Sequence, residues 1–351
     1  MNMSYMMETE INSQADIIEN LINRHIINYC VLMDIPLDVK RICIIASGSS
    51  YNAGIFGKYF FENIANVPTS VEYASEFIGL NFDNYDKDTL YIFLSQSGLS
   101  VDTVEALKKV KEKDVKTLCV TNNLNSTMYN LCDYRFYIDA GLEHAIAATK
   151  TFGATVVMLW LISLKMAQNK HIDISQETSE IYSIKNDILQ SLKSYDNLDL
   201  SAKFLSKLDG FAIFGYGKYY PLALEAGLKI RETSYLNTSV FPSGDFVHGH
   251  FALLNKTKAF LTFITSDATK YELDILKKVL KTYKAKSIVV SDVYEDYDCD
   301  ILLKFQKGRS NIATLVNMII LIQMLSLKIA KRLRRNVDKP QGLIKIVDSK
   351  E

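Results

Sequence analysis

A serine-rich loop is the first part of the sequence whose residue types could do chemistry. Ser95-Gln96-Ser97-Gly98-Leu99-Ser100 follows the apolar run 90–94 and precedes an amphipathic stretch that begins at Val101. The loop would therefore join a strand to a helix N-terminus, where hydroxyl groups, an amide and unpaired backbone N–H groups favour an anion such as phosphate. The alternative is that Ser100 only caps the helix and the other serines only form a turn.

A second loop could contribute to the same ligand. Ala46-Ser47-Gly48-Ser49-Ser50-Tyr51-Asn52 ends a neighbouring apolar run, so Ser49 or Ser50 could reach the anion. Neither loop is a nucleotide-binding motif, because the sequence has no GxGxxG here and no lysine of the GxxxxGK[ST] type.

Three charged residues on one predicted helix are candidates for proton chemistry. Glu225, Lys229 and Glu232 are spaced so that they share a helix face. Their spacing alone does not separate a catalytic group from a salt-bridged surface row, in which each pair contributes only ~0.2–0.5 kcal/mol.

Two of the five histidines, His248 and His250, lie in the glycine-containing segment 243–250. A histidine in such a loop can act as an acid or base near neutral pH. A His-x-His metal site is the rival interpretation, but no third histidine or carboxylate stands at a recognisable ligand spacing. We predict that the protein uses no metal and no other cofactor.

The C-terminal segment carries one more candidate, Lys345. The segment follows a basic run, 331–335, that suits a helix C-terminus. A disordered end is the default expectation. The apolar residues Leu343 and Ile344 could nevertheless dock the segment and bring Lys345 inside.

The elements that must position these residues follow an alternating order. We predict strands at 41–46, 90–94, 117–121 and 134–138 and a helix at 101–111, which together indicate a parallel sheet with crossover helices. Apolar residues recur at helical spacing in the first forty residues and predict an amphipathic helix there. These residues are Ile11, Ile17, Ile18, Leu21, Ile22, Ile26 and Ile27. The apolar stretches 155–166 and 315–327 are shorter than the ~20 residues that a bilayer requires, so we expect buried helices there.

The second half of the chain repeats the first. Gly48 precedes Phe77 by as many positions as Gly217 precedes Phe246, and Cys132-Asp133 is matched by Cys299-Asp300. Where the first half has its serine loop, the second has Phe263-Ile264-Thr265-Ser266-Asp267, whose Asp267 would repel phosphate. We therefore predict one phosphate site in each chain.

We predict an α/β fold with two tandem, doubly wound parallel-sheet domains and flanking helices. The predicted parts are an N-terminal helical segment (1–37), a first, phosphate-binding domain (38–170), a helical connector (171–205), a second domain (206–335) and a C-terminal active-site tail (336–351).

The composition of the chain indicates which kinds of partner and which cellular compartment to expect. The chain of 351 residues has 40 basic and 40 acidic side chains, so it has no net positive field for nucleic acid or an anionic membrane. Its five cysteines are odd in number and form no CxxC pair, which argues against a disulfide framework and favours a reducing compartment. The N-terminus does not resemble a signal peptide. We predict a cytoplasmic protein with a small-molecule partner, and neither nucleic acid nor membrane as a partner.

These features together resemble the sugar isomerase (SIS) domain family, most closely the isomerase half of the glutamine:fructose-6-phosphate amidotransferases, also called glucosamine-6-phosphate synthases. The resemblance covers nearly the whole chain and depends on Gly48-Ser49-Ser50-Tyr51-Asn52, Ser95-Gln96-Ser97-Gly98, Ala148-Thr149-Lys150, Ala223-Leu224-Glu225, Lys229 with Glu232, Gly244 with His248-Gly249, and Val337-Asp338-Lys339-Pro340.

The resemblance implies a role for each candidate. Those implied to bind phosphate are Ser50, Ser95, Gln96, Ser97 and Ser100. Glu232 would move a proton between C1 and C2 of an open-chain sugar, with Lys229 beside the developing charge. His248 would open the sugar ring, and Lys345 would form a Schiff base with the ketose. A homodimer is also implied, in which His248 reaches the site of the other subunit.

The sequence departs from the family at Leu99, Ala148, Asp245 and His250, and it shows no glutaminase half with a leading nucleophilic cysteine. We therefore expect that glutamine is not the amide donor within this chain. The leading hypothesis is an amino-sugar phosphate isomerase/deaminase that converts glucosamine 6-phosphate to fructose 6-phosphate and ammonia. The alternatives are a deglycase for fructosamine 6-phosphates and a non-catalytic sugar-phosphate sensor.

Overall fold

The structure is a computed structural model that describes residues 5–36, 38–79, 85–254, 259–282 and 285–345. The chain forms two compact units. The first-sheet unit comprises Ser13–Glu143, Ala148–Tyr182 and Ile344–Glu351, and the second-sheet unit comprises Met1–Asn12, His144–Ala147 and Ser183–Leu343. The last six residues of the predicted tail, 346–351, lie outside the described part.

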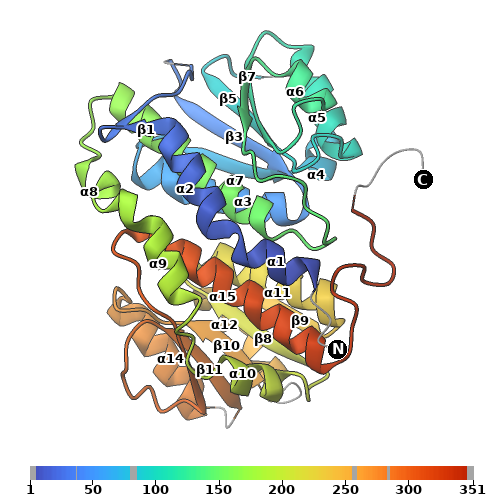
Figure 1. Ribbon diagram of the computed structural model, residues 1–351, viewed down its shortest axis with the longest axis vertical. Helices are drawn as coiled ribbons and strands as arrows, with labels where there is room; N and C mark the ends of the chain where they lie inside the picture. The colour runs from blue at the N-terminus through green and yellow to red at the C-terminus, as the bar shows by residue number, and fades with distance from the viewer. Residues whose placement is uncertain (1–4, 37, 80–84, 255–258, 283–284, 346–351) are drawn as a thin grey trace. The chain divides into compact units, whose positions relative to one another are not determined.

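The first-sheet unit, whose strands β3, β5 and β7 are labelled in Figure 1, contains a parallel five-stranded sheet in the order β4-β3-β5-β6-β7. The strands are β3 (Arg41–Ala46), β4 (Thr69–Tyr73), β5 (Thr89–Leu94), β6 (Lys116–Thr121) and β7 (Tyr134–Tyr137). Every residue of the central strand β5 is buried, as expected for a parallel sheet covered on both faces. The helices are α2 (Gln14–His25), α3 (Gly48–Asn63), α4 (Ala74–Gly79), α5 (Val101–Lys111), α6 (Thr127–Leu131), α7 (Lys150–Asn169) and α8 (Ser175–Thr178).

Hydrophobic periodicity explains how these helices pack. On α5, Val104, Leu107 and Val110 recur at helical spacing and are buried, so they face the sheet. The helix α7 is buried on almost all sides because α2 and α3 pack against it.

The second-sheet unit repeats this architecture, with a parallel sheet in the order β12-β11-β10-β8-β9. Its strands are β8 (Gly210–Gly215), β9 (Asn237–Pro242), β10 (Ala259–Phe263), β11 (Lys286–Ser291) and β12 (Ile301–Lys304). Its helices are α1 (Met6–Asn12), α9 (Ile184–Ser191), α10 (Leu198–Leu205), α11 (Tyr219–Ser234), α12 (Ser243–Phe246), η2 (His250–Leu253), α14 (Lys270–Thr282) and α15 (Asn311–Arg332). The short helix η1 (Ile181–Ser183) contains the sequence boundary between the two units, after Tyr182. Counted along the chain, each sheet has the doubly wound order 2-1-3-4-5, so the predicted fold class is confirmed.

The predicted helix of the first forty residues is wrong at its end. The chain forms α1 and α2, but Ile26 and Ile27 form the strand β1 (Ile26–Ile27), which pairs with β2 (Cys30–Val31) in a hairpin. Asn28 and Tyr29, between these strands, both have positive φ angles, which a continuing helix does not allow.

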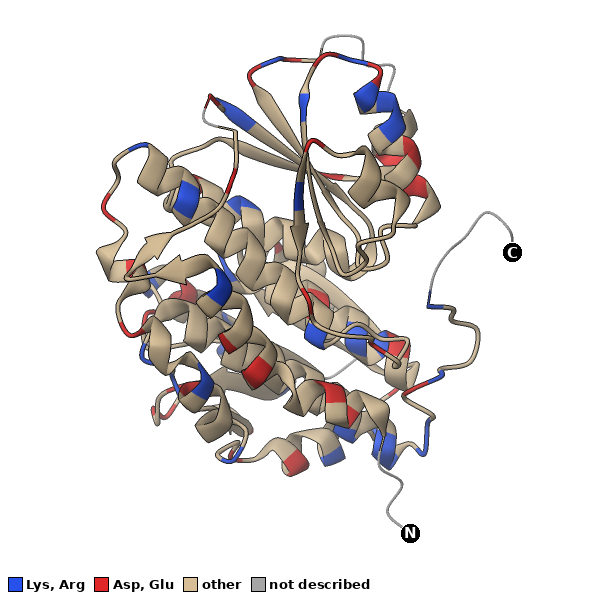
Figure 2. Cartoon of the chain, turned by 45° about the horizontal axis from the view of Figure 1, so that its top comes forward, with Lys and Arg blue, Asp and Glu red and all other residues tan. Residues whose placement is uncertain are grey.

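Two helices, α7 and α15, are long and apolar enough to cross a membrane by length and composition. In each, 89% of the most apolar window is buried inside the protein, as expected for core helices. Charged residues of both signs are interspersed along the elements in the view of Figure 2, in keeping with 40 basic and 40 acidic residues.

Candidate functional site

The serine loop lies at the topological switch point of the first sheet. In this strand order β3 and β5 are neighbours whose following helices leave in opposite directions, and ligands bind at the carboxyl ends of such strands. The residues Gly48–Asn52, predicted as a loop, instead form the beginning of α3 directly after β3, and the loop Ser95–Ser100 follows β5. The fold therefore places both predicted loops at this switch point.

Hydroxyl groups organise the serine loop from within. The Oγ atoms of Ser95 and Ser100 lie 3.1 Å apart, and the Ser95 Oγ accepts a hydrogen bond from the N–H of Gly98 at 3.1 Å. The Ser97 Oγ accepts one from the N–H of Leu99 at 3.2 Å. Ser95 and Ser97 are buried, so these hydroxyls are held in fixed positions beside the backbone donors.

Gly98 makes this loop conformation accessible. Its φ is +63°, a region that side chains with a Cβ rarely adopt, and an added Cβ would lie 2.5 Å from the Cβ of Ser126. Glycine is therefore required both for the backbone angle and for the close approach of α6.

Ser100 does not act as a simple helix cap. It occupies the N-cap position of α5, but its side chain makes no capping hydrogen bond, and its hydroxyl contacts Ser95 instead. The side chain of Ser100 therefore does not cap α5, whereas the hydrogen bonds that Ser95 and Ser97 accept from Gly98 and Leu99 are those of a turn.

The second loop is joined to the same helix. The hydroxyl of Ser47 hydrogen-bonds to the carboxylate of Asp102 in the first turn of α5. Ser49 and Ser50 lie in the first turn of α3 and are partly buried. Next to them, Tyr51 stacks on Tyr73 with the ring centroids 3.6 Å apart. The first-sheet unit thus brings the two predicted loops together at one edge.

The tail lysine is held by a buried carboxylate. The Nζ of Lys345 lies 2.8 Å from the Oε2 of Glu143, whose side chain is fully buried. Glu143 also accepts hydrogen bonds from the backbone N–H groups of Thr149 (2.9 Å) and Thr151 (3.2 Å) and from the Thr151 hydroxyl (2.7 Å). The tail is therefore anchored through the Lys345 ion pair, whereas Leu343 and Ile344, which were expected to dock it, are 38% and 51% exposed.

Burial by itself would raise the pKa of Glu143, but the Lys345 ammonium and the donated hydrogen bonds outweigh it and lower the pKa overall. Glu143 is thus a carboxylate at neutral pH. Sequence reasoning missed this residue, because nothing in its spacing marks it. The available signal was its position shortly before the motif Ala148-Thr149-Lys150.

A buried charge cluster lies on α11 in the second-sheet unit. The Lys229 Nζ lies 2.5 Å from the Glu232 Oε2 and 3.5 Å from the Glu225 Oε1. The side chains of Lys229 and Glu225 are fully buried, whereas that of Glu232 is 23% exposed. This burial rules out the solvated surface row, and it leaves Glu232 as the member of the cluster that a ligand can reach.

The two histidines have different surroundings. His248 is exposed, and its backbone N–H donates to the carbonyl of Asp245. His250 lies 3.1 Å from the Asp245 carboxylate through its Nε2 and stacks on Phe241 with the ring centroids 4.1 Å apart. Within the described ranges, no group of three or more His, Cys, Asp or Glu side chains could hold a metal ion.

The predicted residues divide between the two units. The phosphate loops and Lys345 belong to the first-sheet unit, and Lys229, Glu232 and His248 belong to the second-sheet unit. Among the described residues, Glu232 pairs with Lys229 and forms no hydrogen bond or ion pair with His248.

The fold and its serine loop define a sugar isomerase domain protein. A family model for the SIS domain matches residues 37–165 and 205–300, so the chain belongs to the SIS domain family, as the motifs predicted.

Curated relatives within this family have sequences similar to that of the chain. The chain is 34% identical over 325 residues to the glutamine–fructose-6-phosphate aminotransferase (isomerizing) of Francisella tularensis, which covers 88% of this chain and 52% of the relative. It is 31% identical to the enzyme of the same name from Campylobacter jejuni, over 98% of this chain and 58% of the relative. The chain therefore spans about half the length of these relatives.

Solved structures agree with this correspondence. The C-terminal domain of glucosamine-fructose-6-phosphate aminotransferase from Francisella tularensis matches with a TM-score of 0.89 and 30% identity, covering 97% of this chain and 99% of that domain. Glucosamine-6-phosphate deaminase from Thermotoga maritima has the same fold, with a TM-score of 0.75 at 20% identity.

Proposed function

We propose that the protein is a cytoplasmic phosphosugar isomerase/deaminase that converts glucosamine 6-phosphate and water to fructose 6-phosphate and ammonia. The observation that carries the proposal is the Lys345–Glu143 pair, because it holds an amine in the same unit as the phosphate loop. Relatives named for glutamine–fructose-6-phosphate aminotransfer support the choice of an amino sugar and a ketose.

The phosphate would be held by the loop Ser95–Ser100. The loop combines hydroxyls at fixed positions with the start of α5, whose first-turn N–H groups receive no cap from Ser100. Hydrogen bonds to a charged phosphate contribute about 1.5–3 kcal/mol each. Ser49 and Ser50, from the first turn of α3, would complete the phosphate site.

Glu232 would carry out the isomerisation. In the open-chain amino sugar, its carboxylate removes the proton from C2 and returns it to C1, which converts the aldehyde into an alcohol and the C2 amine into an imine. Lys229 is a fully buried ammonium 2.5 Å from the Glu232 carboxylate, so it would stabilise the negative charge that develops on the substrate oxygen during this shift.

Lys345 would release the ammonia. Its neutral amine attacks the C2 imine, the original nitrogen leaves as ammonia, and water then hydrolyses the lysine imine to the ketose and the free amine. Glu143 would hold the Lys345 amine in position, since the two groups lie 2.8 Å apart, and Lys345 would lose its proton when substrate binding disrupts this pair. His248, exposed on its loop, would open the sugar ring from the partner subunit of a homodimer.

The proposal is tested by incubating the purified protein with glucosamine 6-phosphate and measuring ammonia and fructose 6-phosphate. Lys345→Ala should abolish ammonia release, whereas Lys339→Ala, which removes an exposed lysine of the same segment, should leave it unchanged. Release of an amino acid from fructosamine 6-phosphates, without ammonia from glucosamine 6-phosphate, would replace this proposal with the deglycase. Binding of the sugar phosphate without turnover would favour the sensor.

A further inference from the structure

The second sheet has a counterpart of the serine loop. The N–H of Ile264 donates to the carbonyl of Val290, just as the N–H of Ser95 donates to the carbonyl of Val120. Counting two residues onward in each strand, Ser266 corresponds to Ser97, and Asp292 corresponds to Asn122. The carboxyl edge of the second sheet thus retains hydroxyls at Ser266 and Thr269, where the first sheet has Ser97 and Ser100, and it has a carboxylate where the first sheet has a neutral amide.

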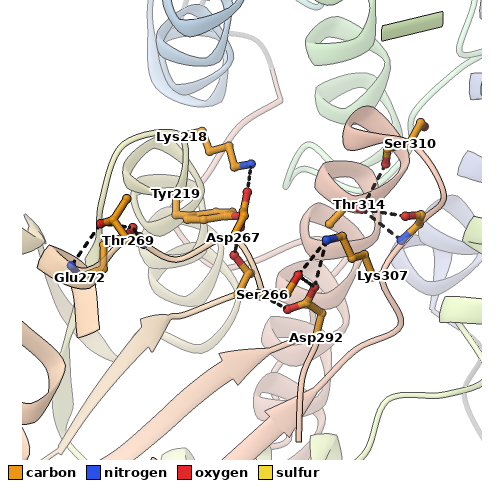
Figure 3. Close-up of polar contacts among 12 residues, drawn as sticks. Lys218, Tyr219, Ser266, Asp267, Thr269, Glu272, Asp292, Lys307, Ser310 and Thr314 are labelled. Atoms are coloured by element: carbon orange, nitrogen blue, oxygen red, sulfur yellow. Dashed lines mark hydrogen bonds and ion pairs between the residues drawn. The ribbon is translucent and has the colours of Figure 1, made fainter. Parts of the chain in front are cut away.

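Asp292 is held by the donors of this loop, as Figure 3 shows. Its Oδ1 accepts the N–H of Ser266 at 2.7 Å, and its Oδ2 accepts the Ser266 hydroxyl at 2.7 Å. The ammonium of Lys307 lies 2.7 Å from the Ser266 Oγ and 3.9 Å from the Asp292 Oδ2. The Asp292 side chain is only 1% exposed, so a fixed negative charge fills this place.

A backbone N–H, a hydroxyl and an ammonium are the donors that proteins use for phosphate and sulfate. In the first sheet, Asn122 turns away from the serine loop: its amide donates to the Gly141 carbonyl at 2.8 Å and accepts the N–H of Ala140 at 2.9 Å. In the second sheet, the Asp292 carboxylate turns onto Ser266. At this position the second sheet has a carboxylate that binds the loop, whereas the first sheet has an amide that does not.

The neighbouring donors of the second sheet are engaged in the same way. Glu272 accepts the N–H and the hydroxyl of Thr269 at 2.7 and 2.8 Å, which closes the N-terminus of α14. Asp267 accepts from Lys218 at 2.6 Å and from the hydroxyl of Tyr219 at 3.0 Å (Figure 3). Three internal carboxylates therefore take the donors at this edge, and among them Asp292 is the one bound by both Ser266 and Lys307.

We propose that Asp292 is the resident anion of an oxyanion site in the second sheet, so that removing its carboxylate leaves a site for inorganic phosphate or sulfate. The site consists of the Ser266 N–H and hydroxyl together with the Lys307 ammonium. The inference depends on the geometry of the second-sheet unit alone and does not require the proposed sugar chemistry.

The test uses the full chain with Ser95→Ala and Ser97→Ala in every variant, so that the first-sheet loop does not contribute. Equilibrium dialysis against radiolabelled inorganic phosphate, at constant ionic strength, counts the phosphate bound per chain. Adding Asp292→Ala should add one phosphate per chain, which unlabelled sulfate displaces. Adding Lys307→Met as well should weaken that binding at least about tenfold, because it removes the ammonium that binds Ser266 and Asp292.

The matched control is Asp296→Ala, which removes an exposed carboxylate from the same loop without freeing the donors of Ser266. It should add no phosphate. The proposal is overturned if Asp292→Ala binds no more phosphate than its background, or if Asp296→Ala gains as much. If Asp292→Ala does not fold in chloride, phosphate must restore its circular dichroism, and failure in both buffers counts equally against the proposal. Persistent sugar-phosphate binding by the Ser95/Ser97 background would contradict only the proposed function.

Discussion

Two glycines of the first-sheet unit should respond very differently to the same substitution. Gly48 and Gly98 both have left-handed backbone angles, with φ of +57° and +63°. A Cβ added at Gly48 meets no atom within 4 Å, whereas one added at Gly98 lies 2.5 Å from the Cβ of Ser126 and 2.9 Å from the Thr121 Oγ1. Gly48→Ala and Gly98→Ala should therefore both strain the backbone, but only Gly98→Ala should also add a steric clash.

The expected magnitudes follow from these two effects. A residue with a Cβ in the left-handed region costs about 1–2 kcal/mol, which is the whole expected loss for Gly48→Ala. Overpacking in a buried, well-ordered site costs a further ~1–3 kcal/mol. Gly98→Ala should thus lower the free energy of unfolding by about 2–5 kcal/mol. The difference between the two variants isolates the contact with α6.

Urea unfolding followed by tryptophan fluorescence measures this difference. The single tryptophan, Trp160, lies on α7 and is 1% exposed, so its emission reports on the first-sheet unit. If Gly98→Ala and Gly48→Ala lose the same free energy, within about 0.5 kcal/mol, the packing of the serine loop against Ser126 described above is refuted.

Three further outcomes are expected. Glu232→Gln should bind sugar phosphate but slow the exchange of the substrate's C1 or C2 hydrogen with deuterium by about 10²–10⁴-fold, and exchange at the normal rate would remove Glu232 from the role of base. Mixing inactive Lys345→Ala and His248→Ala subunits should restore about a quarter of wild-type activity, because half the dimers then carry one intact site; no recovery despite exchange would place both groups in one chain. Burial alone would raise the pKa of Asp267, but hydrogen bonds led by that from Lys218 lower it to about 2. Since the folded-state pKa is depressed, the stabilisation is present above about pH 4 and is lost as pH falls towards about 2. Because Asp267 is partly exposed, solvent screening limits this stabilisation to about 1 kcal/mol. The unfolding free energies of wild type and Asp267→Asn should therefore converge as the pH falls from about 4 to about 2. A difference that stays constant over this pH range would contradict this account.

Most of the fold could be predicted because it depends on local patterns. The predicted strands of the first sheet match β3, β5, β6 and β7 to within one residue, and the predicted helix 101–111 matches α5. The edge strands β4 and β9 were not predicted, because their residues are only partly buried and lack a continuous apolar run. The repeat was visible as matched spacings, and the identical strand order of the two sheets confirms it.

The candidate site could be predicted only in part. The residue types that could bind an anion were apparent in the sequence, since a serine-rich turn between a strand and a helix places hydroxyls beside unpaired backbone N–H groups. The sequence did not show which charged side chains are buried or which ion pairs they form, because both depend on residues far away in the chain. Spacing left Lys229 open as a surface residue, and the fold buries it completely beside Glu232.

The sequence by itself determined the alternation of strands and helices, the repeat and the placement of the serine loop, because these depend on hydrophobic periodicity and on short-range turn chemistry. Only the tertiary structure decided which charges meet. Glu143 and Lys345 lie far apart in the sequence but form an ion pair, and Asp292 turns its carboxylate onto Ser266. Such pairs form because a charge removed from water must find a partner wherever the fold places one, and no local pattern specifies that partner.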